Sequence, residues 1–289
     1  MYKDIFQLLR PQQWVKNGIV LAGLIFSGNA WRFDLCLLSA ATTIFFCLLS
    51  SSVYIINDII DAEADRKHPI KRHRPIASGR VTAANAAVLA AILGIGSLAA
   101  TFILAKNLFI IAAAYAVLSL LYSLFLKHIV IIDVMSIAAG FVLRALAGAV
   151  VINVAFSGWL LISSFLLALF LGFGKRRHEF ILLEEGGSEH RRILAKYNDY
   201  FLDQLIGVVT PAVLVCYLLY VISPEVEEKL GTHYLYLTTP FVIYGIFRYL
   251  YLIHLEQQGG SPTTIMLTDR PILATVLLWL ATAIALLYF

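Results

Sequence analysis

The sequence predicts an all-α polytopic membrane protein, in which nine transmembrane helices form one domain over residues 1–289 around a cavity that faces the cytoplasm. Three observations predict this fold: the composition, the recurrence of uncharged stretches and the uneven placement of Lys and Arg. Hydrophobic residues make up 60% of the chain and charged residues 14%, and the mean hydropathy is +0.83. Soluble chains have about 45–50% apolar and about 25% charged residues, so this composition excludes a soluble enzyme and a disordered or fibrous protein.

Stretches without charge that are long enough to cross a bilayer recur along the chain. A helix needs about 20 apolar residues to cross about 30 Å of hydrocarbon. The first stretch is short, because its 15 residues rise only about 22 Å as an α-helix, but Trp14 and Lys16 could extend it by anchoring at the interface. The nine predicted spans are residues 17–31, 35–57, 86–105, 107–126, 129–151, 153–174, 204–223, 233–253 and 271–289.

Lys and Arg concentrate on one side of these spans. Seventeen of the 22 lie in the N-terminal segment and in the loops after the second, fourth, sixth and eighth spans, whereas three lie on the other side. The positive-inside rule therefore places the N-terminus and these loops in the cytoplasm and the C-terminus outside. The net charge is only +4, and we expect no nucleic-acid partner.

The second predicted span ends in an acidic face. If the helix continues, Asp58, Asp61 and Asp65 lie on one side of it. Asn57 lies on the same side, because Asp61 follows it by four residues and Asp65 by eight. Carboxylates packed this closely repel one another unless a cation lies between them. Mg²⁺ takes one or two carboxylates and completes its shell with waters and substrate phosphates. The pattern predicts a Mg²⁺ site, although a solvated acidic helix end would have the same spacing.

A run of cations follows the acidic face. Residues 68–80 contain Lys71, Arg72 and Arg74 between two prolines. Lys and Arg bind phosphate oxygens that a metal leaves free, so the run predicts a polyphosphate site beside the acids. The alternative is a segment that only follows the positive-inside rule or contacts anionic lipid.

Polar residues at other predicted helix ends fall at the same depth, and two acids four residues apart stand where the seventh span begins. We expect them to surround one site between the helices at the cytoplasmic surface. These residues are Lys16, Lys127, Asp133, Lys175, Arg176, Arg177, Asp199 and Asp203.

Arg144 lies deeper than these groups, about 11 residues or roughly 16 Å along the helix from Asp133. An arginine within the membrane is costly and faces the interior of the bundle. It could hold a substrate phosphate, or pair with a buried carboxylate or helix carbonyls.

Motifs of other enzyme classes are absent from the sequence. It contains no GxxxxGK[ST] phosphate loop, no GxSxG elbow and no HExxH pair. Its seven histidines have no ligand spacing, so we expect no zinc, and its three cysteines lie in apolar stretches without a CxxC pair, which indicates free thiols.

The segment Asn57-Asp58-x-x-Asp61-x-x-x-Asp65 resembles the first aspartate motif of the UbiA superfamily of membrane prenyltransferases, and Asp199-x-x-x-Asp203 stands where the second motif is expected. The number of spans and the order of the motifs agree over essentially the whole chain. The resemblance implies a UbiA-like bundle and a Mg²⁺-dependent transfer. It also implies metal ligands (Asn57, Asp61 and Asp65) and catalytic residues (Asp58, Asp61, Asp65 and Asp203).

Residues 10–17, 65–79, 133–145, 174–177 and 201–204 are similar to one branch of that superfamily. This branch transfers 5-phosphoribosyl from 5-phosphoribosyl 1-diphosphate to a decaprenyl-like polyprenyl phosphate, releases diphosphate and serves cell-wall synthesis. The resemblance implies a multi-pass protein of the bacterial plasma (inner) membrane with a cytoplasmic active site, and a homo-oligomer is possible. The residues expected to bind substrate are Lys16, Asn17, Lys71, Arg72, Arg74, Lys127, Arg144, Lys175, Arg176 and Asp199.

Two other functions fit parts of the pattern. A conventional prenyltransferase of the same superfamily would move a prenyl group from prenyl diphosphate to an aromatic acceptor, and it would need fewer phosphate contacts. A transporter of an anionic lipid or metabolite would place its binding groups near the midplane, on broken helices. Most polar groups here gather at one interface, which favours an enzyme.

Overall fold

The computed structural model describes residues 2–69, 71–155, 157–184, 196–256, 260 and 262–289, and within these ranges it contains helices and no strand. Eight helices are long and apolar enough to span a membrane. This confirms the all-α polytopic fold. The eight are α3 (Phe33–Ile60), α5 (Ala83–Leu104), α6 (Lys106–Leu124), α7 (Ile132–Val151), α8 (Gly158–Glu184), α9 (Asp199–Val221), α11 (Thr239–His254, preceded by the 3₁₀ turn η5, Leu235–Thr238) and α13 (Arg270–Tyr288).

The first predicted span takes a different form. After α1 (Tyr2–Leu9), the chain forms a 3₁₀ helix, η1 (Pro11–Leu21), and then the short α2 (Ala22–Ile25). A 3₁₀ helix rises about 2.0 Å per residue against about 1.5 Å for an α-helix, so η1 and α2 together extend about 28 Å. The segment therefore runs nearly the thickness of a bilayer although it is too short to do so as an α-helix.

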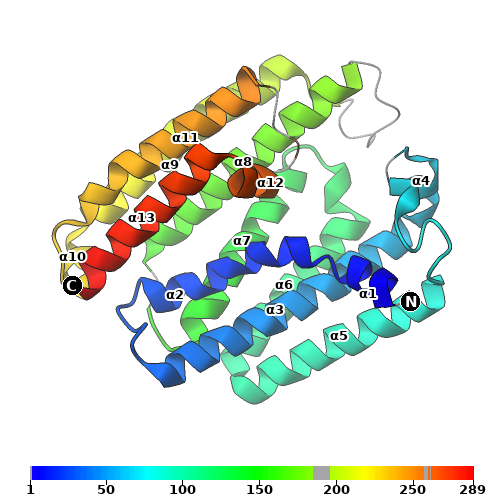
Figure 1. The fold of residues 1–289 in the computed structure, drawn as a ribbon, viewed down its shortest axis with the longest axis horizontal. Coiled ribbons are helices and arrows are strands. Elements are labelled where there is room, and N and C mark those ends of the chain that lie inside the picture. Colours follow the sequence, from blue (N-terminus) through cyan, green and yellow to red (C-terminus); the bar gives the residue numbers. More distant parts are fainter. Residues whose placement is uncertain (1, 70, 156, 185–195, 257–259, 261) are drawn as a thin grey trace.

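Two groups of helices make up the bundle (Figure 1). One contains α3, α5, α6 and α7 with η1 and α2; the other contains α8, α9, α11 and α13, and the two meet where α7 packs against α8. The chain begins at the end of the bundle that carries α4 (Ala62–Lys67) and finishes at the end that carries α10 (Pro224–Leu230). Opposite ends require an odd number of passes, which favours η1–α2 as a ninth pass.

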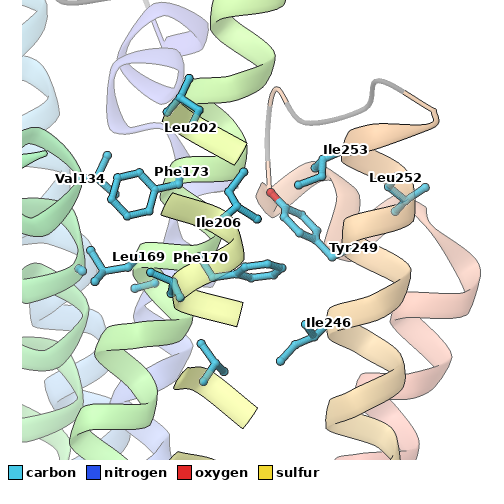
Figure 2. Packing of buried hydrophobic residues seen from close by; sticks show 14 of the residues in the cluster. Val134, Leu169, Phe170, Phe173, Leu202, Ile206, Ile246, Tyr249, Leu252 and Ile253 are labelled. Atoms are coloured by element: carbon cyan, nitrogen blue, oxygen red, sulfur yellow. The ribbon is translucent and has the colours of Figure 1, made fainter. Parts of the chain in front are cut away.

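Apolar side chains fill the second group and cover its junction with α7. Phe173 of α8 meets Val134 of α7, and Phe170 packs near Tyr249 of α11, with ring centroids 5.3 Å apart (Figure 2). Large apolar side chains elsewhere face outward, such as Ile103 on α5, which is 84% exposed. That distribution suits a bundle surrounded by lipid, where the outer surface is as apolar as the core.

Glycine allows η1 and α2 to approach α7 closely. A Cβ at Gly148 would overlap the carbonyl oxygen of Val20, and a Cβ at Gly23 would lie 2.9 Å from the Ala149 nitrogen. Small residues at helix contacts are a general means of close packing in membranes. The position of η1, and of every polar group on it, therefore depends on these two positions.

Gly148→Ala should lower the apparent melting temperature of the detergent-solubilised protein by about 3–10 °C, because overpacking costs about 1–3 kcal/mol. Gly96→Ala on α5 is the control, since no atom lies within 4 Å of the added Cβ and alanine favours a helix. An equal effect of the two substitutions on the melting temperature would contradict the close packing of η1.

Candidate active site

A cavity of about 1070 Å³ lies at the α4 end of the bundle. Ligand pockets of drug-sized molecules occupy about 300–1,000 Å³, so this cavity has room for more than one small substrate. Its wall comes from η1, α3, α4, α6, α7 and α8 and the loops beside them. It brings together nine residues expected from the sequence, namely Lys16, Asn57, Asp61, Asp65, Lys71, Arg74, Lys127, Arg144 and Lys175.

The acidic segment is not one continuous helix. The helix α3 ends at Ile60, Asp61 adopts φ −87° and ψ 1°, and α4 begins at Ala62. The backbone bonds from Asp61 N to Asn57 O (2.9 Å) and from Asp65 N to Asp61 O (2.8 Å) continue across the turn. The i, i+4 spacing therefore still places Asn57, Asp61 and Asp65 on the cavity wall.

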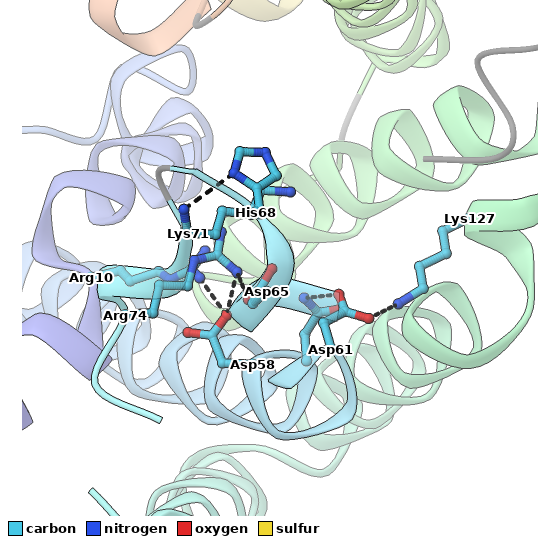
Figure 3. A network of polar contacts seen from close by, with 9 residues as sticks. Arg10, Asp58, Asp61, Asp65, His68, Lys71, Arg74 and Lys127 are labelled. Carbon is cyan, nitrogen blue, oxygen red and sulfur yellow. Dashed lines mark hydrogen bonds and ion pairs between the residues drawn. The ribbon is translucent and has the colours of Figure 1, made fainter. Parts of the chain in front are cut away.

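Each aspartate of this segment pairs with a cation (Figure 3). The Nη1 of Arg74 donates to Asp58 Oδ1 (2.9 Å) and to Asp65 Oδ2 (2.6 Å), and Arg10 Nη2 donates to the same Asp58 oxygen (2.5 Å). The Nζ of Lys127 donates to Asp61 Oδ1 (2.7 Å). Asp58 is only 3% exposed and does not line the cavity, so its contacts are with the two arginines.

The donor set suits a divalent cation only after these pairs open. Asp61 and Asp65 both face the cavity beside the Asn57 amide, and Mg²⁺ usually takes one or two carboxylates from a protein. In this arrangement, however, Lys127 and Arg74 neutralise the two carboxylates. Among the described residues, no group of three or more His, Cys, Asp or Glu side chains is placed to hold a metal ion.

The 3₁₀ geometry of η1 separates its side chains into columns, because three residues per turn place i and i+3 directly in line. Gln13 and Lys16 share one column and line the cavity, as does Arg10, which precedes the helix in the left-handed conformation. The next column faces α3 and α7: Trp14 Nε1 donates to Ser51 Oγ (3.0 Å), and Asn17 is fully buried.

Arg144 marks the deep end of the cavity. Its Nε donates to Asn17 Oδ1 and its Nη2 to Tyr115 OH, both at 2.7 Å. Of the alternatives left open by the sequence, pairing with a carboxylate is excluded within the part of the chain that the structure describes. Asn17 thus orients Arg144 and does not itself line the cavity.

Arg176 and Asp133 form a buried pair behind the cavity wall. Arg176 Nε donates to Asp133 Oδ2 (2.6 Å), and its Nη1 donates to Oε2 of Glu179 (2.5 Å), which lines the cavity. Tyr197 donates to the second oxygen of Asp133 (2.9 Å), and burial raises the pKa of the Tyr197 phenol, which stays a donor. The structure places Arg176, expected to bind substrate, where it holds Glu179.

Three further expected residues lie outside the cavity wall. Asp203 pairs with Arg177 (2.5 Å) and with His254 (3.3 Å), on the side of α9 that faces α8 and α11. Asp199 begins α9 and accepts the backbone N–H of Tyr200 (2.7 Å). Arg72 is exposed, so the structure does not bring these three to the aspartates of α3 and α4.

Several cavity residues were missed from the sequence. Arg10 anchors Asp58 and lies 5.4 Å from the Tyr54 ring centroid, Tyr115 contacts Arg144, and Glu179 pairs with Lys175 (3.7 Å). The i, i+4 spacing of Lys175 and Glu179 was the available signal for the last one. The other two contacts join distant segments and leave no trace in local spacing.

Comparison with known proteins gives both a family and a fold. The model of the UbiA prenyltransferase family matches residues 18–268. A decaprenyl-phosphate phosphoribosyltransferase of Mycolicibacterium smegmatis is 36% identical over 300 residues, which cover 100% of this chain and 94% of that protein. One of Corynebacterium glutamicum is 32% identical over 289 residues, covering 98% and 86%.

Solved structures share the arrangement of helices. A UbiA homolog from Archaeoglobus fulgidus, bound to GPP and Mg²⁺, superposes with a TM-score of 0.72 at 17% identity and covers 99% of this chain and 100% of that chain. At this level of identity the likeness establishes the fold alone.

Arg74→Ala should destabilise the protein by on the order of 3 kcal/mol, because it leaves two buried carboxylates with less compensation. Arg72→Ala, two residues away and exposed, should change stability by less than about 0.5 kcal/mol. Thermal unfolding of both variants measures the difference. Equal stability would mean that Arg74 does not neutralise Asp58 and Asp65.

Proposed function

Because the chain belongs to the UbiA prenyltransferase family, we propose that it transfers 5-phosphoribosyl from 5-phosphoribosyl 1-diphosphate to a decaprenyl-like polyprenyl phosphate and releases diphosphate. The names of its nearly full-length relatives support this reaction. The observation on this chain that carries it is the charge of the cavity wall. Seven Lys and Arg side chains and three carboxylates line the cavity, a surplus of four positive charges.

That surplus suits a donor with phosphates at both ends. The proposed donor carries a diphosphate and a separate 5-phosphate, and the acceptor brings a third phosphate group. A prenyl diphosphate with an aromatic acid as the acceptor would bring one diphosphate and one carboxylate only. Lysine and arginine are the side chains that bind phosphate oxygens directly, so the cavity favours phosphoribosyl transfer over the conventional prenyl transfer.

The proposed metal is Mg²⁺, with Asn57, Asp61 and Asp65 as its protein ligands. When bound, it would neutralise the charge that develops on the leaving diphosphate. The pairs of Lys127 with Asp61 and of Arg74 with Asp65 then have to open. The freed cations turn to the diphosphate oxygens, with Lys71 and Lys175 beside them on the cavity wall.

The transfer itself needs no general base. An anionic oxygen of the lipid phosphate forms a bond to C1 of the ribose, while the bond from C1 to the diphosphate oxygen breaks and its electron pair leaves with the diphosphate. Attack from the face opposite the leaving group inverts C1. The chain contributes binding and orientation, which account for a large share of the rate in reactions of charged phosphates.

The remaining expected residues enter this proposal with indirect roles. Asp58 positions Arg10 and Arg74, and Arg176 positions Glu179. The catalytic role of Asp203, and the binding roles of Asp199 and Arg72, would require contacts beyond the cavity wall. We further propose that the α4 end faces the cytoplasm of a bacterium, at its plasma membrane, since a water-soluble donor has to reach the cavity.

Converting Asp61 to Asn should lower formation of labelled lipid from labelled 5-phosphoribosyl 1-diphosphate, polyprenyl phosphate and Mg²⁺ by at least about a hundredfold. EDTA should stop the wild-type reaction. The matched control is Asp34→Asn, the same change at the other, exposed end of α3. Full activity of Asp61→Asn, or transfer from a prenyl diphosphate to an aromatic acid by the wild type, would contradict the proposal.

Lys127→Gln should bind Mn²⁺ at least about fivefold more tightly than the wild type in the absence of diphosphate, because a competing charge is removed from Asp61. Electron paramagnetic resonance of the free metal measures this without turnover. Lys106→Gln, an exposed lysine at the far end of α6, should leave the Mn²⁺ affinity unchanged. An unchanged Mn²⁺ affinity in Lys127→Gln would mean that Lys127 does not compete with the metal for Asp61.

A further inference from the structure

Two cations at the deep end of the cavity, Arg144 and Lys16, form no ion pair with any carboxylate of the described residues, and the like charges of Arg144 and Arg10 repel Lys16. Arg144 is 6% exposed, and its hydrogen-bond partners are the Asn17 amide and the Tyr115 hydroxyl. The ring centroids of Tyr115 and Phe141 lie 4.6 Å and 5.2 Å from its guanidinium carbon. Lys16 is half-buried on the same cavity wall.

The other cations near this wall are compensated. Arg10, Arg74 and Lys127 each pair with an aspartate at 2.5 to 2.9 Å. Across the residues that the structure describes, no carboxylate lies within 4 Å of the charged nitrogens of Arg144 or Lys16. A buried charge without a counterion is costly, so a counterion that arrives with a ligand would bind strongly there.

Arg144 has N–H groups beyond the two that donate to Asn17 and Tyr115. A guanidinium has five N–H donors, and Asn17 and Tyr115 accept from Nε and Nη2 only. Its Nη1 lies beside Gly140, where an added Cβ would come within 3.8 Å of that nitrogen. Gly140 and Arg144 both line the cavity, so a ligand there can reach this end of the guanidinium.

We propose that Lys16 and Arg144 form a binding site for a phosphate monoester, and that it takes the phosphate of the acceptor lipid. A dianionic monoester matches two positive charges, and the planar guanidinium binds two phosphate oxygens at once. The proposal rests on the proposed function for the identity of the lipid. It assigns the deep end to the nucleophile and the aspartate end to the leaving group.

Two observations favour the lipid over the 5-phosphate of the donor. The cavity wall contains Leu118, Ile137 and Phe141, which provide an apolar path for the first units of a prenyl tail. Asp61 and Asp65 lie at and beyond the end of α3 whereas Arg144 lies within α7, and all three line one cavity, so a phosphate at Arg144 can approach C1 from the side opposite the diphosphate.

The test measures binding to the full-length protein in phosphatidylcholine nanodiscs by calorimetry, with farnesyl phosphate as the probe and farnesol as the uncharged reference. Arg144→Gln and Lys16→Gln should each weaken farnesyl phosphate binding about tenfold or more and leave farnesol unchanged. Arg32→Gln, at an exposed position near the opposite end, is the control. Lys16→Gln keeps the test valid if Arg144→Gln does not fold.

Wild-type affinity for farnesyl phosphate in both variants would overturn the proposal. If their affinity for 5-phosphoribosyl 1-diphosphate falls instead, the site binds the donor's 5-phosphate and the assignment to the lipid is wrong. Because the binding measurement needs no turnover, a failure of the proposed binding site can be distinguished from a failure of the proposed reaction. A wild type that binds farnesyl phosphate through Arg144 but forms no phosphoribosyl lipid would overturn the reaction and leave the site standing.

Discussion

Neutralisation of the aspartates at the end of α3 is the constraint on which the site depends. Asp58 and Asp65 are almost fully buried, and buried carboxylates are unfavourable without close cations. Arg74 contacts both of them, so it fixes the segment that follows α4 beside the acids. The same side chains therefore stabilise the fold and supply the cations that a polyphosphate substrate attracts. In the proposed reaction, opening of these pairs would link substrate binding to the release of Asp61 and Asp65.

The second constraint is the conformation of η1. In an α-helix, a step of three residues turns by about −60°, so Lys16 would be rotated about 60° from Gln13. The 3₁₀ form keeps both on the cavity wall while Asn17 and Val20 remain buried against the neighbouring helices. Long 3₁₀ helices are uncommon, and this one is held by tight packing of its backbone against Gly148. The packing of η1 against Gly148 thus holds the 3₁₀ conformation, and this conformation places Lys16 on the cavity wall.

Hydropathy predicted eight of the helices because lipid-exposed helices are apolar over their whole length, which is a local property of the sequence. The spacing of Asn57, Asp61 and Asp65 also placed them together, since i, i+4 contacts are local. The pairing of Arg176 with Asp133 joins residues 43 positions apart, and nothing in local spacing marks it. For the same reason the sequence could not show that Asp203 pairs with Arg177 on another face of the bundle. The helical form of residues 11–21 was missed because composition does not distinguish 3₁₀ from α geometry.

The chemical identity of the transferred group is the central claim, and mass spectrometry of the lipid product tests it most directly. Purified protein in nanodiscs would receive 5-phosphoribosyl 1-diphosphate and a prenyl diphosphate as equimolar donors, with a polyprenyl phosphate and an aromatic acid as equimolar acceptors. The account predicts a polyprenyl phosphate that has gained one phosphoribosyl group and an aromatic acid that stays unmodified. A prenylated aromatic acid without any phosphoribosyl lipid would contradict it.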